Sequence, residues 1–209
     1  MLVTGIKSKP VYAPLQADAR GRYHLMLGMG VGAAPLLRVI AEMRGAAAAS
    51  LENTRVLFVP DAAGGTGAGA PAGVEQFRDA GVDHADSYAT TAALLEEFRH
   101  SLASSLMGTR LYVAGPESFI GLAMKIALEF NLNKDEIRAE ECGTLARRVY
   151  CIHCRATTEN VRTNIVRCVG CERWLLVRDH YSRRLAAYMG VMVDAEAPGE
   201  LPPLVEVFL

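Results

Sequence analysis

Four of the five cysteines in this 209-residue chain form two C-x2-C pairs, Cys151 with Cys154 and Cys168 with Cys171, thirteen residues apart. Each pair can form a turn that presents two sulfurs to one ion, and two facing turns complete a tetrahedron. Where thiols are kept reduced, this spacing favours a metal site over disulfides. The pattern therefore predicts a small domain folded around one metal ion.

Zinc suits four thiolate ligands, and a saturated four-sulfur site leaves no open position for substrate, so the zinc would be structural. The alternative is a rubredoxin-like iron site, which moves one electron with the same geometry. Rubredoxin-like proteins have a longer gap and a glycine after each pair, where this chain has Arg155 and Glu172, so the sequence favours zinc. Four thiolates leave no place for His153 or His180, and we expect the fifth cysteine, Cys142, in a buried strand.

Upstream of the cysteines, short apolar runs alternate with segments of helical periodicity. Parallel strands need crossover connections, and those connections are helices, so we expect an α/β fold with a doubly wound five-stranded parallel sheet. The strands are predicted over 23–27, 54–59, 82–88, 110–114 and 137–142, with helices after 32 and over 74–80, 91–106 and 119–130. The predicted domains are 1–144, irregular over 1–22, and 145–209, a zinc ribbon with an extended C-terminal tail.

Charge is distributed unevenly along the chain, although the formal net charge is only −1. Residues 143–190 contain nine arginines and three acidic residues, whereas the tail that follows contains four acidic residues. One tryptophan and few lysines make a poor stacking platform for nucleic acid. A basic surface that faces solvent or a partner protein is therefore favoured, and a zinc-ribbon regulator that binds nucleic acid is the alternative.

The longest uncharged apolar stretch covers 25–37 and is too short and too rich in glycine to span a bilayer. The first ten residues lack the apolar core and cleavage site of a secretory signal. We therefore expect a cytoplasmic protein with no membrane partner.

Gly28, Gly30 and Gly32 follow the first predicted strand and open a helix, where glycines let a pyrophosphate approach backbone amides. Asp61, at the end of the second strand, is placed to hydrogen-bond a ribose, as acidic residues there do for NAD. Glycine turns also serve only to pack a strand against a helix, and Asp61 could be a loop cap. No acid, base or nucleophile constellation is recognisable, so no catalytic residue is predicted.

The segments HLMLGMGVGAAPLLRVIAEM and LYVAGPESFIGLAMKIALEFNL resemble strand-to-helix units of the NAD-binding domain of ferredoxin reductase and phthalate dioxygenase reductase enzymes. The resemblance covers 23–142. It implies that Gly28, Gly30 and Gly32 hold the pyrophosphate of NAD(P)H, and that Gly115, Pro116 and Glu117 border the nicotinamide. The chain departs from that family at Ala114, where the family has cysteine, and about twenty irregular residues stand where a flavin-binding barrel would precede the domain.

The segment YCIHCRATTENVRTNIVRCVGCERWLLVRDHYSRRLAAYMGV resembles the small subunit of bacterial dimethylamine monooxygenase, and with the N-terminal part the resemblance covers nearly the whole chain. It implies an auxiliary subunit of an NAD(P)H-dependent haem oxygenase that converts dimethylamine to methylamine and formaldehyde. The expected partners are a haem oxygenase subunit and reductase subunits that carry flavin and iron–sulfur groups. The zinc ribbon would then dock a partner; an iron electron-transfer subunit is the alternative.

Overall fold

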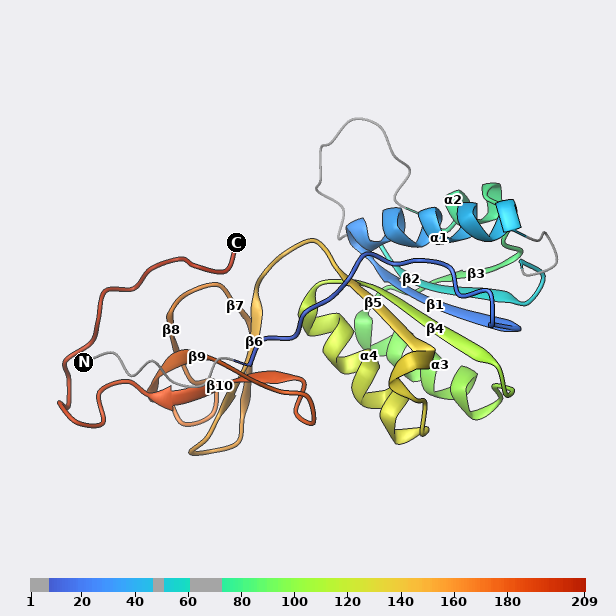
Figure 1. Cartoon of the computed structure of the whole chain (residues 1–209). Coiled ribbons are helices and arrows are strands. Elements are labelled where there is room, and N and C mark those ends of the chain that lie inside the picture. The colour runs from blue at the N-terminus through green and yellow to red at the C-terminus, as the bar shows by residue number, and fades with distance from the viewer. Residues whose placement is uncertain (1–7, 47–50, 61–72) are drawn as a thin grey trace. The chain divides into compact units, whose positions relative to one another are not determined.

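The computed structural model describes residues 8–46, 51–60 and 73–209 (Figure 1). The chain divides into two compact units, Tyr12–Gly143 and Thr144–Leu209, the latter together with the start of the chain. Ser8 belongs to the second unit because its N–H donates to the Asp179 carbonyl and its own carbonyl accepts from the N–H of Tyr181. Residues 8–11 therefore group with the cysteine-containing unit and not with the parallel sheet.

A five-stranded parallel sheet forms the centre of the first unit, in the order β3-β2-β1-β4-β5. The middle strands are apolar and buried along most of their length, as expected for a parallel sheet covered on both faces. The first strand continues two residues past its predicted end, so Gly28 lies within it. The strands are β1 (Tyr23–Met29), β2 (Thr54–Val59), β3 (His84–Ser87), β4 (Thr109–Gly115) and β5 (Ile137–Glu141).

Helices cover both faces of this sheet, and each face has its own core (Figure 1). Leu36 and Phe77 belong to one core, Phe98 and Phe119 to the other, which confirms the doubly wound α/β fold. The third helix ends earlier than predicted, and Leu106 lies beyond it with 60% of its surface exposed. The helices are η1 (Gly30–Gly32), α1 (Ala33–Ala46), α2 (Glu75–Asp79), α3 (Thr91–Ala103), α4 (Glu117–Glu129) and η3 (Lys134–Glu136).

The segment before β1 is held against the sheet by an ionic network. The buried Asp18 carboxylate accepts hydrogen bonds from Arg20, from Arg110 at the start of β4 and from Arg138 at the start of β5. Its backbone N–H donates to the Tyr112 hydroxyl. The Arg20 hydrogen bond, opposed by burial and reinforced by the charges of Arg20 and Arg138, holds the pKa of Asp18 well below its usual range. Residues that lack regular secondary structure are thus fixed by side chains from two strands.

The second unit contains another five-stranded sheet, in the order β7-β6-β10-β9-β8. The neighbours β6 and β10 run parallel, and the remaining neighbours are antiparallel. Its buried core includes Cys151 and Cys168 beside Leu175 and Tyr188, so the core and the predicted metal site share residues. The strands are β6 (Arg147–Cys151), β7 (Thr157–Val161), β8 (Ile165–Arg167), β9 (Trp174–Ser182) and β10 (Ala187–Met192).

Within the described ranges, no helix combines the length and the apolar character that a membrane span requires.

Candidate metal centre and nucleotide-binding edge

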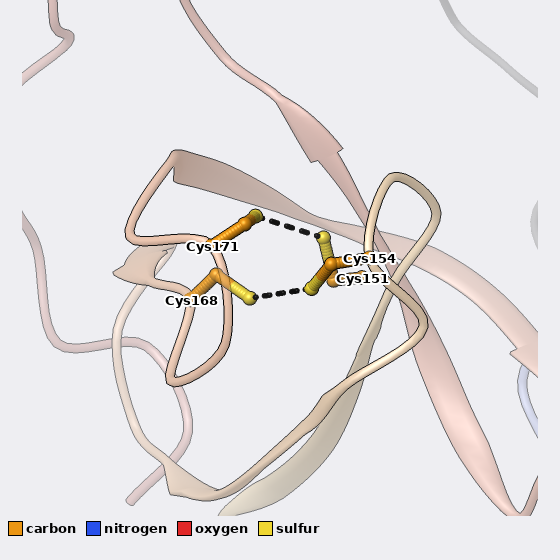
Figure 2. A group of neighbouring side chains, drawn as sticks. All are labelled: Cys151, Cys154, Cys168 and Cys171. Atoms are coloured by element: carbon orange, nitrogen blue, oxygen red, sulfur yellow. Dashed lines mark hydrogen bonds between the residues drawn. The ribbon is translucent and has the colours of Figure 1, made fainter.

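The four paired cysteines meet at one point in the second unit. Figure 2 shows Cys151 and Cys154 facing Cys168 and Cys171, and their sulfurs all lie within 4.8 Å of one another. The Sγ atoms of Cys151 and Cys171 are 3.7 Å apart, and those of Cys154 and Cys168 are 3.4 Å apart. A tetrahedron with zinc–sulfur bonds of about 2.3 Å has edges of about 3.8 Å. The donor set and its spacing therefore fit one thiophilic ion.

Two turns of matching backbone geometry carry these sulfurs. In the first turn the Arg155 N–H donates to the Cys151 carbonyl at 2.9 Å, and in the second the Glu172 N–H donates to the Cys168 carbonyl at 3.0 Å. Arg155 and Glu172 have φ values of 66° and 58°, in the left-handed region that glycine usually occupies. The two turns therefore adopt the backbone of a glycine-containing turn without the glycine.

Arg173 acts on this site and was not identified from the sequence. Hydrogen bonds from the Arg173 backbone N–H and then from its guanidinium lower the pKa of the Cys171 thiol to about 6. The Ala156 N–H lowers the pKa of the Cys154 thiol, but desolvation and the neighbouring sulfurs outweigh it and raise that pKa to about 11. An arginine two residues after a C-x2-C pair is the sequence signal that could have revealed this contact.

The remaining candidates near the cysteines lie outside the cluster. His153 and His180 are both exposed, and among the described residues the cluster contains only cysteines. Cys142 is half-buried and follows β5 directly, so its predicted place within a buried strand is wrong by one residue. Its N–H donates to the Gly115 carbonyl, and burial raises the pKa of its thiol to about 11.

The predicted nucleotide-binding glycines lie at the carboxyl ends of the parallel strands. A Cβ on Gly28 would lie 2.9 Å from both Leu36 Cδ1 and Phe58 Cδ2, and a Cβ on Gly32 would lie 2.2 Å from the Ala114 carbonyl oxygen. These two glycines are therefore required by packing, whether or not a ligand binds. Gly30 has φ +54° and forms the turn itself, which leaves its backbone at the edge of the sheet.

Gly115, Pro116 and Glu117 lie at the same edge, beside the first turn. Gly115 ends β4 and Glu117 begins α4, where its side chain is buried. Asp61 lies outside the described residues. Two chain segments that the sequence assigned to one ligand are thus neighbours in space, since β1 and β4 are adjacent strands.

Comparison with known proteins gives two matches to one protein family. The model of the N-terminal domain of "dimethylamine monooxygenase subunit DmmA-like" proteins matches residues 4–137, and the model of their C-terminal domain matches residues 148–191. The chain belongs to this family. The resemblance found in the sequence to dimethylamine monooxygenase subunits is therefore confirmed, and both halves of the DmmA-like pattern are present.

A curated relative of this DmmA-like chain is the "heme-dependent oxidative N-demethylase delta subunit" of Ectopseudomonas mendocina, 34% identical over 98 residues. The match covers 47% of this chain and 56% of that protein, so the chain spans about half the length of this relative.

Similar solved structures include phthalate dioxygenase reductase, with a TM-score of 0.44, 14% identity and coverage of 69% of this chain and 45% of that one. Another is the ferredoxin reductase of carbazole 1,9a-dioxygenase, with a TM-score of 0.42, 16% identity and coverage of 60% and 34%. The fold assignment itself rests on the strand order and the two helix layers described above.

Proposed function

We propose that this DmmA-like chain is an auxiliary subunit of a multi-subunit, NAD(P)H-dependent haem oxygenase that demethylates dimethylamine to methylamine and formaldehyde. The observation that carries the proposal is the match of both family domains to one chain, over 4–137 and 148–191. The oxidation itself would be carried out by companion subunits that hold haem, flavin and iron–sulfur groups. This chain would contribute binding surfaces and no catalytic residue.

Zinc in the four-sulfur site would have a structural role. Cys151, Cys154, Cys168 and Cys171 would hold the ion, and four thiolates leave it without an open position for substrate. Because Cys151 and Cys168 are also core residues of this unit, the ion would stabilise the fold of the second sheet.

The arginines of the second unit would face a companion protein. Arg147, Arg148 and Arg167 form ion pairs within the unit. A second set is exposed and supports docking to an acidic protein surface by opposite charge: Arg155, Arg162, Arg183 and Arg184.

The glycine turn at the carboxyl edge of the parallel sheet would hold a dinucleotide through backbone amides. Gly30 at the turn and the N-terminus of α1 are the groups that would approach a pyrophosphate. Isothermal titration calorimetry of the chain with NADH and with NADPH tests whether a dinucleotide binds. Absence of heat at millimolar ligand would leave the first unit as a scaffold for assembly.

Copurification from the native host, with metal analysis and an absorption spectrum, tests the whole proposal. We expect the chain to elute with haem and flavin proteins and to contain one zinc per chain. A chain that elutes alone would refute the assembly. The matched pair of variants is Cys154→Ser, expected to lose the metal, and Cys142→Ser, expected to keep it.

Iron in the four-sulfur site is a second candidate. Arg155 and Glu172 adopt the left-handed backbone that suits the glycine found after each cysteine pair in rubredoxin-like iron proteins. The chain would then relay single electrons between reductase and oxygenase subunits. A coloured protein with iron and without zinc after anaerobic preparation would establish this candidate and exclude the structural zinc.

A further inference from the structure

The last twelve residues of the chain, 198–209, are called the tail here, and their backbone is fixed although they form no regular strand. Glu206 makes an antiparallel bridge with Thr163. On either side of it, the Asn164 N–H donates to the Val205 carbonyl and the Val207 N–H donates to the Arg162 carbonyl. The tail therefore runs along the connection between β7 and β8 in a defined register.

An aromatic contact anchors the end of the tail. The guanidinium of the buried Arg147 lies 3.7 Å from the centre of the Phe208 ring and 3.9 Å from that of Tyr188. Arg147 also forms an ion pair with Asp179 at 2.9 Å. The anchored tail is therefore part of the folded unit.

The tail exposes its aliphatic side chains in spite of this order. Leu204 and Leu209 are 61% and 65% exposed. An ordered segment that keeps several aliphatic side chains in solvent is typical of an interaction site. The exposed aliphatic residues of the tail are Leu201, Leu204, Val205, Val207 and Leu209.

Charge and backbone geometry indicate what these side chains would contact. The charged side chains of the tail are Glu200 and Glu206, and it contains no lysine or arginine, so two tails placed side by side would repel each other, whereas a basic surface would attract one. In the antiparallel pattern, Val205 and Val207 bond inward, so the N–H and C=O of Glu206 point outward. That edge can accept another extended segment.

We propose that the tail is a docking strand for a companion subunit that presents an aliphatic groove rimmed by lysine and arginine. The existence of such a companion rests on the proposed function. The tail contact differs from the arginine surface of the second unit in its charge and in its dependence on aliphatic side chains, although the backbone carbonyl of Arg162 in that surface accepts hydrogen bonds from the Val207 and Phe208 N–H groups of the tail.

Binding of the zinc-loaded full chain to each purified companion subunit, measured by biolayer interferometry at low and high salt, tests the proposal. The double variant Leu204→Ser/Val207→Ser should weaken binding by about tenfold or more, because burial of each aliphatic side chain contributes to affinity. Glu206→Lys should weaken binding mainly at low salt. The matched controls are Met107→Ser, at a side chain that is 95% exposed, and Glu96→Lys, on an exposed face of α3, and both should bind normally.

Phe208 is retained in all variants, so the anchor stays intact, and circular dichroism and zinc content verify the fold. Unchanged affinity in the folded double variant would overturn the tail proposal and leave the proposed function standing. Self-association that depends on the tail, seen as a larger mass in light scattering, would show that the tail binds a second copy of this chain, and would also overturn the tail proposal. A wild-type chain that binds no companion would refute the proposed function, and the docking strand with it.

Discussion

Removal of the metal should unfold the second unit and leave the first unit folded. The second unit has a small apolar core, and two of its buried members, Cys151 and Cys168, belong to the proposed metal site. A core of this size supplies at most about 3–5 kcal/mol without a staple, whereas structural zinc contributes on the order of 10 kcal/mol. The apo form of the second unit should therefore be largely unfolded. The first unit has two extensive cores that contain no ligand and should keep its stability.

Hydrogen exchange followed by mass spectrometry, before and after chelation, measures this difference. Protection should be lost across β6 to β10, including the N–H groups of Cys151 and Cys168, which donate to the carbonyls of Ala156 and Arg173 at 2.9 Å in both cases. Protection in β1, β2 and β4 should be retained. The Cys142→Ser variant, which leaves the cluster intact, should respond to chelator as the wild type does. If β6 to β10 stayed protected after elemental analysis had shown complete loss of metal, the ion would not stabilise this unit and the reasoning would be refuted.

Two other properties of the first unit can be tested by denaturation. Gly32→Ala should destabilise the first unit by about 3 kcal/mol, because the new Cβ would clash with the Ala114 carbonyl. Gly45→Ala, whose Cβ meets nothing within 4 Å, should stabilise it by about 0.5–1 kcal/mol. Urea unfolding compares the two variants, and equal stability would contradict the packing role of Gly32. Burial lowers the pKa of His24 in the folded state, so on acidification the imidazole is protonated in the unfolded chain before it is protonated in the folded one. The contribution of His24 to the free energy of unfolding should therefore be complete above about pH 6.5 and fall as the pH is lowered below it. His24→Phe should flatten this slope in melting curves, and an unchanged slope would exclude His24 as its source.

The parallel sheet could be predicted because its signals are local. Each strand is a short apolar run, and each crossover helix repeats its apolar residues at helical spacing, so order and type follow without knowledge of the packing. Boundaries were less predictable. Leu106 continues the helical pattern of α3, yet the chain leaves the helix before it, because an apolar side chain at the right spacing does not by itself extend a helix.

The cysteine cluster could also be predicted, since its four ligands are specified by type and spacing alone. The turn conformations at Arg155 and Glu172 could not, because neither residue type favours a positive φ. In this conformation the N–H groups of both residues donate to the carbonyls of Cys151 and Cys168 and close the two turns. The missing glycines, one of the two sequence differences that favoured zinc over iron, therefore have no counterpart in the backbone of the turns. Metal analysis is the measurement that decides between the two metals.

The fixed position of the tail depends on contacts that sequence patterns do not carry. Its proline-rich sequence indicates an extended backbone, but the residues that fix it, Asn164 and Arg147, lie far away along the chain. Asn164 binds the Val205 N–H across 41 positions, and Arg147 meets Phe208 through a cation–π contact. The proposed metal would likewise join two turns that are distant in sequence. The tail contacts and the cysteine cluster both join residues that are far apart in sequence, so local interactions contribute little to the stability of the second unit. Loss of the metal should therefore release the tail as well as the strands.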